Sequence, residues 1–80
     1  MQETRLIGLG DVARMLGVSV KTVTRMDRAG LIPAPVHPAG GRALRWDRRE
    51  LSVWLNRRDH RGELLTRSEW LTVRDSALAA

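Results

Sequence analysis

The stretch from Asp11 to Gly30, DVARMLGVSVKTVTRMDRAG, decides the fold of this chain. Apolar residues lie on one side of its first part, and Gly17 is the kind of residue with which helices commonly end. Ser19 then has the side chain of a helix N-cap, and Gly30 is a matching stop signal. The stretch therefore predicts two short helices joined by a tight turn at residues 16–19.

Two helices at this spacing are typical of a helix-turn-helix, which places its second helix in the major groove of DNA. We expect Gly10 or Asp11 to cap the first helix, and Val20, Val23 and Met26 to face inward from the second. Six polar positions of the second helix are expected to face outward and to contact DNA. They are Ser19 at the helix start, then Lys21, Thr22, Thr24, Arg25 and Arg28.

The outward residues differ in the contacts that they can make with DNA. Arg25 has the forked side chain that binds guanine O6 and N7, and Thr22 suits a thymine methyl group or a phosphate. Lys21 is expected to contact phosphate, and backbone N–H groups beside Ser19 offer a further phosphate site. Arg28 either contacts phosphate or faces water. The alternative for the whole set is the solvated face of an ordinary amphipathic helix.

The next segment, LIPAPVHPAGGRALRW at residues 31–46, has a different character. Three prolines within it exclude a helix. Gly40-Gly41 favours a turn between two extended pieces, at about residues 32–37 and 42–46. The segment therefore predicts a small β-hairpin, a wing.

Two arginines of the expected wing are candidates for DNA contact. Arg42 and Arg45 would enter the minor groove or bind phosphates. The alternative for Arg45 is packing over Trp46 or pairing with Asp47.

A recurring four-residue pattern predicts two further helices. Asp47 followed by Glu50 is typical of a capping box and predicts a third helix that runs to about Arg58. Thr66-Arg67-Ser68-Glu69 repeats the pattern and predicts a tail helix at about residues 67–78. The fold class expected is mainly α with a small β-hairpin, a winged helix-turn-helix.

These elements divide the chain into a DNA-binding domain at residues 6–58 and a C-terminal extension at residues 59–80. Trp46 and Trp54 are expected in the core of the domain, where indoles contribute much buried area. The extension has two interpretations. Its Trp70 either folds back over the small core or belongs to an apolar patch for a second copy or a partner protein.

Composition favours a nucleic-acid partner. Fourteen basic residues face nine acidic ones for a net charge of +5, and every base but one is arginine, the side chain best suited to bidentate phosphate and guanine contacts. An arginine-rich composition inherited from a GC-rich genome would explain the preference for arginine over lysine but not the net charge.

Several classes of protein find little support in the sequence. The chain has no cysteine and only two histidines, so we expect no metal site and no cofactor. Ser19 and Ser52 have no evident histidine partner, so we expect no enzyme. Neither an apolar run of membrane-spanning length nor a secretory signal is evident, and the expected location is the cytoplasm with no membrane partner.

The order of these features resembles the winged-helix module of the MerR superfamily in its minimal form, as in AlpA-like regulators and phage or plasmid excisionases. Residues 9–58 carry the resemblance, through DVARMLGVSVKTVTRMDRAGLIP, GGRALRW and DRRELSVWL. Met26 and Asp27 depart from it, because the family often has an aromatic residue and a basic or small one there. The long dimerisation helix and effector domain of full MerR regulators are not expected in these 80 residues.

The resemblance implies a sequence-specific protein that binds double-stranded DNA. One expected role is an excisionase, a recombination directionality factor that binds repeated sites, associates with itself on DNA and assists an integrase. The alternative is a small transcriptional regulator. An alternative from another class is a protein-interaction adaptor that binds no DNA. The sequence leaves the DNA site, the number of copies on DNA and the partner of residues 59–80 open.

Overall fold

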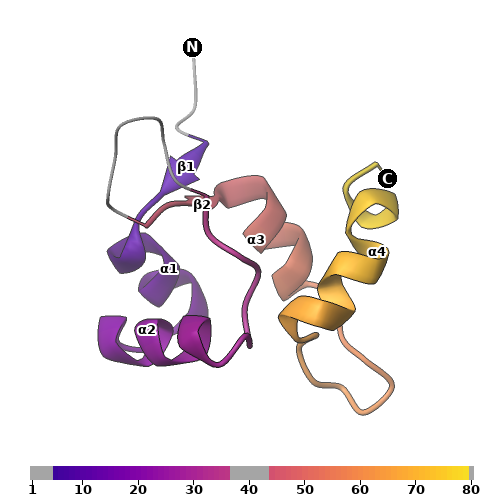
Figure 1. Cartoon of the computed structure of the whole chain (residues 1–80), viewed down its shortest axis with the longest axis horizontal. Helices are drawn as coiled ribbons and strands as arrows, with labels where there is room; N and C mark the ends of the chain where they lie inside the picture. The colour runs from indigo at the N-terminus through magenta and orange to yellow at the C-terminus, as the bar shows by residue number, and fades with distance from the viewer. Residues whose placement is uncertain (1–4, 37–43, 80) are drawn as a thin grey trace.

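The computed structural model describes residues 5–36 and 44–79, and within these ranges it contains four helices and two short strands. Figure 1 shows α3 between the α1–α2 pair and α4. In chain order the elements are β1 (Leu6–Ile7), α1 (Leu9–Leu16), α2 (Val20–Arg28), β2 (Trp46–Asp47), α3 (Arg48–Leu55) and α4 (Arg67–Ala79). The mainly helical winged helix-turn-helix predicted from the sequence is confirmed.

The small sheet joins the start of the chain to the segment before α3. β1 pairs antiparallel with β2, with Leu6 opposite Asp47 and Ile7 opposite Trp46. The N-terminal strand was not predicted. Between the two extended pieces predicted for the wing, the described residues form a single antiparallel bridge, from Val36 to Arg45. The prolines of the first piece lack the N–H donors that a longer ladder needs. The end of the second piece pairs instead with β1, through Trp46 and Ile7.

Helix α1 starts before the predicted capping residues. Gly8 is its N-cap and has no side chain that could form a capping bond. The Gly8 carbonyl accepts the backbone N–H of Val12 at 3.1 Å. The predicted cap at Gly10 or Asp11 is therefore wrong, because the helix begins directly after β1. The predicted end at Gly17 is correct, and its φ of 73° is the left-handed conformation that glycine adopts without strain.

Helix α2 begins and ends as predicted. Ser19 Oγ accepts the N–H of Thr22 at 3.1 Å. At the other end Leu31 donates its N–H to the Met26 carbonyl at 2.9 Å, across a left-handed Gly30, which is a Schellman motif. The inward face is shorter than predicted, because Val23 is fully buried but Val20 is 45% exposed. Val20 is the first residue of the helix, and the third predicted residue, Met26, is half-buried and packs against the core.

Helix α3 is capped as predicted but is shorter. Asp47 Oδ1 accepts the N–H of Glu50 at 3.0 Å. The helix ends at Leu55 rather than near Arg58. The side-chain amide of Asn56 donates to the Ser52 carbonyl at 2.8 Å, which is the acceptor that the Asn56 backbone N–H would use if the helix continued.

All three tryptophans lie in one core, and the tail contributes to it. Trp46, Trp54 and Trp70 are at most 1% exposed, together with apolar residues from α1, α2 and α3. Trp46 Nε1 donates to the Pro33 carbonyl at 3.0 Å, and Trp54 Nε1 donates to the Leu65 carbonyl at 2.8 Å. Of the two interpretations of the tail, the structure has the one in which it folds back over the core.

The buried Glu50 connects α3 to α4. Its Oε2 accepts Nε1 of Trp70 and Nε of Arg74, each at 2.8 Å. The predicted capping box at Asp47 is therefore only half formed. The Glu50 side chain points into the core and binds α4 in place of the Asp47 N–H. The second predicted box is complete, since Thr66 donates its N–H to Glu69 Oε1 at 2.9 Å and Thr66 Oγ1 accepts the Glu69 N–H at 3.3 Å.

Candidate nucleic-acid interface

The start of α2 is exposed and organised by its cap. Ser19 and Thr22 are linked twice, since Ser19 Oγ accepts the Thr22 N–H and donates to Thr22 Oγ1 at 3.0 Å. The other N–H groups of a first helical turn have no partner within the helix. Both hydroxyls and these N–H groups lie where an anionic ligand can approach.

Three cations follow along the exposed side of α2. Lys21, Arg25 and Arg28 are all exposed, at i, i+4 and i+7 spacing, and none of them forms an ion pair with a residue that the structure describes. Thr24 is half-buried and its hydroxyl donates to the Val20 carbonyl at 3.2 Å, so it lies at the edge of this face. We call the exposed residues Ser19, Lys21, Arg25 and Arg28, together with the half-buried Thr22 that is bonded to Ser19, the α2 face.

The wing is described only at its base. Val36 and Arg45 exchange backbone hydrogen bonds, with the Val36 N–H donating at 2.6 Å and the Arg45 N–H at 3.2 Å. This bridge brings the two ends of the segment together, as a hairpin requires. The predicted contact residue Arg42 falls at residues 37–43, outside the described residues.

The side chain of Arg45 lies against the domain. It is half-buried, and its Nη1 donates to the Leu44 carbonyl at 3.0 Å. The same atom lies so close to Gly8 that an added Cβ would be 3.3 Å away. Asp47 instead lies near Arg5, at 3.6 Å, so the alternative in which Arg45 pairs with Asp47 is not the arrangement seen.

Other arginines of the domain have separate surroundings. Arg14 on α1 is ion-paired with Asp11 of the same helix. Arg49 on α3 donates to the Leu78 carbonyl at 2.8 Å and so ties α3 to the end of α4. Three more are exposed and form no ion pair with a described residue: Arg48, Arg57 and Arg58.

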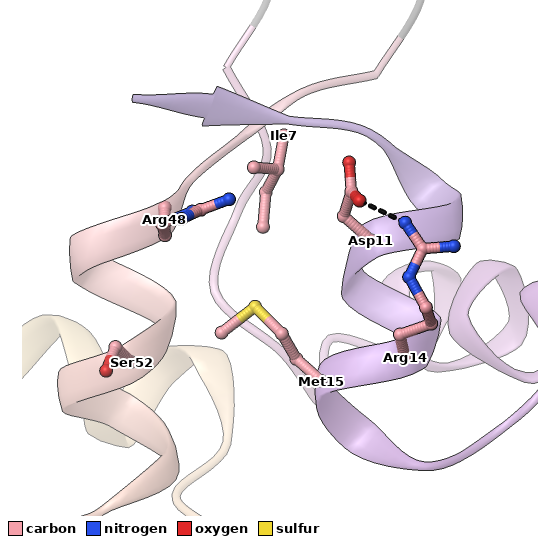
Figure 2. Close-up of a pocket in the computed structure, with 6 residues that line it drawn as sticks. All are labelled: Ile7, Asp11, Arg14, Met15, Arg48 and Ser52. Atoms are coloured by element: carbon pink, nitrogen blue, oxygen red, sulfur yellow. Dashed lines mark hydrogen bonds and ion pairs between the residues drawn. The ribbon is translucent and has the colours of Figure 1, made fainter. Parts of the chain in front are cut away.

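A shallow pocket of about 390 Å³ lies between α1 and α3 (Figure 2). Figure 2 shows the paired Asp11 and Arg14 on one side and Arg48 and Ser52 on the other, with apolar side chains between them. No histidine lies among the lining residues to activate the Ser52 hydroxyl. Elsewhere in the described ranges, no three His, Asp or Glu side chains are grouped as metal ligands would be.

Hydrogen bonding shifts the pKa of two groups outside the α2 face. The backbone N–H of Glu63, and after it that of Arg61, hold the pKa of the Asp59 carboxyl below its ordinary value of 3.8 despite some desolvation. The hydrogen bond and charge of Glu50 raise the pKa of the Arg74 guanidinium above its ordinary value. Both groups have structural roles.

Comparison with known proteins identifies the two-helix unit. Residues 9–44 match the family model for the MerR family regulatory protein. The chain contains a MerR-type helix-turn-helix, a module that binds double-stranded DNA. No curated protein and no solved structure gives a significant match. Among the helices that the structure describes, none is both long and apolar enough to span a bilayer.

The structure thus brings most of the residues predicted to contact DNA together on the α2 face, with Thr24 at its edge and Arg45 apart. One residue beside this site was missed. Arg67 of α4 reaches the last turn of α2 and binds Asp27. Asp27 alone hints at a cation near the end of α2, because an acidic residue is unfavourable at the negative end of a helix dipole, but nothing in the sequence points to Arg67.

Proposed function

We propose that this protein binds double-stranded DNA at specific sequences, with the α2 face in the major groove. The observation that carries the proposal is the set of cations on α2, exposed and without ion pairs to described residues, in a MerR-type helix-turn-helix. In this arrangement Arg25 contacts guanine, Thr22 contacts a thymine methyl group or a phosphate, and Ser19 and Lys21 contact phosphate. Arg28 adds a phosphate contact, and Thr24 packs near the sugar–phosphate backbone of the DNA.

The wing supplies the second contact. Arg42 and Arg45 bind the flanking minor groove or the phosphates beside it. The support for this is the Val36–Arg45 bridge, which closes the base of the segment that carries both arginines. For Arg45, the contact requires its guanidinium to leave the Leu44 carbonyl and turn outward.

The biological role that we propose is DNA-site binding in recombination, as an excisionase that assists an integrase. The resemblance of residues 9–58 to excisionases and AlpA-like regulators supports it. A small winged helix covers few base pairs, so specificity requires several copies on repeated sites or a partner beside it. The family match to regulatory proteins favours a second role, transcriptional regulation, which would use the same contacts with DNA.

Binding to selected duplexes tests the α2 assignment. A site is first selected from random duplexes with the wild-type protein, and affinities for this site and for mismatched sites are then measured over a range of salt concentrations. Arg25→Ala should lose preference at one base pair, about 1–3 kcal/mol of discrimination. Arg25→Lys should keep the salt dependence but not the preference, because it retains the charge without the fork. Arg42→Ala should weaken all duplexes alike.

Two outcomes would contradict the proposal. Unchanged base preference in Arg25→Ala would remove α2 as the reading helix. No duplex binding by the wild-type protein at low salt would favour the adaptor alternative. The two biological roles are separated by an excision assay with a candidate integrase, run beside a promoter reporter.

A further inference from the structure

Arg67, the first residue of α4, binds the C-terminal end of α2 and the loop after it through four hydrogen bonds. Its Nη2 donates to Asp27 Oδ1 at 2.7 Å and to the Asp27 carbonyl at 3.2 Å. Its Nε donates to the Ile32 carbonyl at 3.0 Å, and its backbone N–H donates to the Gly30 carbonyl at 2.9 Å. One residue of the tail therefore binds both the last turn of α2 and the loop that leaves it.

The position of Asp27 explains why a cation is needed there. The carbonyls at the end of α2 carry partial negative charge, so a carboxylate in the last turn is unfavourable. The Arg67 guanidinium offsets both, and the Asp27–Arg67 pair is mostly shielded from water, at 18% and 28% side-chain exposure. Charge-assisted hydrogen bonds in such surroundings are stronger than neutral ones at the surface.

Asp27 also lies close in sequence to the cations of the α2 face. It follows Arg25 by two residues and precedes Arg28 by one, in a helix of nine residues. Without Arg67 its charge would oppose the attraction of this end of the helix for phosphate. The pairing with Arg67 therefore affects the electrostatics of the α2 face as well as the geometry of the helix.

We propose that Arg67 is a positioning residue for DNA recognition. It fixes the C-terminal end of α2 and neutralises Asp27, so that the α2 face meets DNA in one orientation. This inference rests on the proposed function, in which α2 reads DNA. It assigns residues 59–80 a part in DNA binding, although no residue of α4 belongs to the α2 face.

A second arginine of the same helix provides the matched control. Arg74 binds Glu50 of α3 at 2.8 Å and Asp75 at 3.4 Å, and it makes no hydrogen bond to a described residue of α2. Arg67→Ala and Arg74→Ala each remove one guanidinium from α4 and one ion pair to another helix. Loss of α4 packing affects both variants, whereas loss of the α2 contact affects only the first.

The first test measures duplex affinity, well below the melting temperature of each variant. Arg67→Ala should weaken binding to the selected site about tenfold, because fewer molecules hold α2 in the binding-competent orientation. Arg74→Ala should bind within about twofold of wild type. Arg67→Lys should recover only part of the affinity, since lysine lacks the fork. Asp27→Asn in the Arg67→Ala background should recover part as well, by removing the unpaired charge.

The second test needs no DNA. Hydrogen–deuterium exchange should be faster in Arg67→Ala at the amides of Gly30 and Leu31, which close the end of α2, and unchanged there in Arg74→Ala. Equal affinities in Arg67→Ala and Arg74→Ala, or unchanged exchange at these amides, would overturn the inference while leaving the Arg25 result intact. Absence of any duplex binding by the wild-type protein would overturn the inference together with the proposed function.

Discussion

Helices α3 and α4 begin with the same four-residue pattern but use it differently. In both, the first side chain accepts the N–H of the glutamate three residues later, at Asp47 for α3 and at Thr66 for α4. The Glu69 carboxylate in turn accepts the Thr66 N–H, which completes a local capping box. The Glu50 carboxylate makes no such bond to Asp47. It accepts hydrogen bonds from Trp70 and Arg74 of α4 instead.

The surroundings of the two glutamates explain the difference. Glu69 is exposed, whereas Glu50 is buried where α3 packs on α4. The buried indole N–H of Trp70 needs an acceptor, and Glu50 supplies it. The same capping motif therefore makes a tertiary contact where a buried donor lies within reach of its glutamate.

The largest effect on this comparison is expected at Glu50. Glu50→Ala should destabilise the fold by about 2–3 kcal/mol, because it leaves a buried indole N–H unpaired and a cavity beside it. Glu50→Gln should cost about 1 kcal/mol, since an amide oxygen still accepts one of the two bonds. Arg74 is 40% exposed and can turn to water, which limits both losses. Thermal unfolding followed by circular dichroism measures them, and a loss no larger in Glu50→Ala than in Glu69→Ala would contradict the anchor.

The capping residues themselves should behave alike. Asp47→Ala and Thr66→Ala each remove one acceptor from an N-terminal turn, and each should cost about 1 kcal/mol. Similar losses at the caps and unequal losses at the two glutamates would establish that only the second half of the motif differs. Urea denaturation of the four alanine variants provides the measurement. A much larger loss in Asp47→Ala than in Thr66→Ala would indicate that the strand pairing at Asp47 also depends on its side chain.

The smallest effect concerns a carboxylate that organises a turn without starting a helix. Asp59 Oδ1 accepts the N–H of Arg61 at 2.8 Å and of Glu63 at 3.0 Å, which lowers its pKa from 3.8. Its contribution to stability is present above pH 3.8 and is lost as the pH falls through the lowered value. The signal of the Asp59 side-chain carboxyl in NMR should titrate with a midpoint below pH 3.8. A midpoint at or above 3.8 would contradict the assignment.

Local signals in the sequence predicted the elements of the DNA-binding unit. Ser19 and Gly30 mark the ends of α2 because capping and left-handed turns depend on the residue itself and its immediate neighbours. The α2 face follows from the helical period of its cations. The start of α1 was misplaced, since it depends on β1, and β1 exists only because a partner strand lies beside it.

Contacts between distant parts of the chain were beyond sequence reasoning. Glu50 looks like a capping residue and Asp27 like a surface acid until α4 is in place, 20 residues from the one and 40 from the other. Arg45 illustrates the same point in the wing, because its interaction with the Leu44 carbonyl beside Gly8 cannot be deduced from strand alternation.

The sequence by itself determined the helix-turn-helix, the caps of α2, α3 and α4, and the cations that line α2. Only the tertiary structure decided that the tail packs on the core, that Glu50 binds Trp70 and Arg74, and that Arg67 closes the end of α2. The physical reason is range. Capping, turn conformation and helical period act within about five residues along the chain, whereas a buried donor or charge is paired with whatever the fold brings to it.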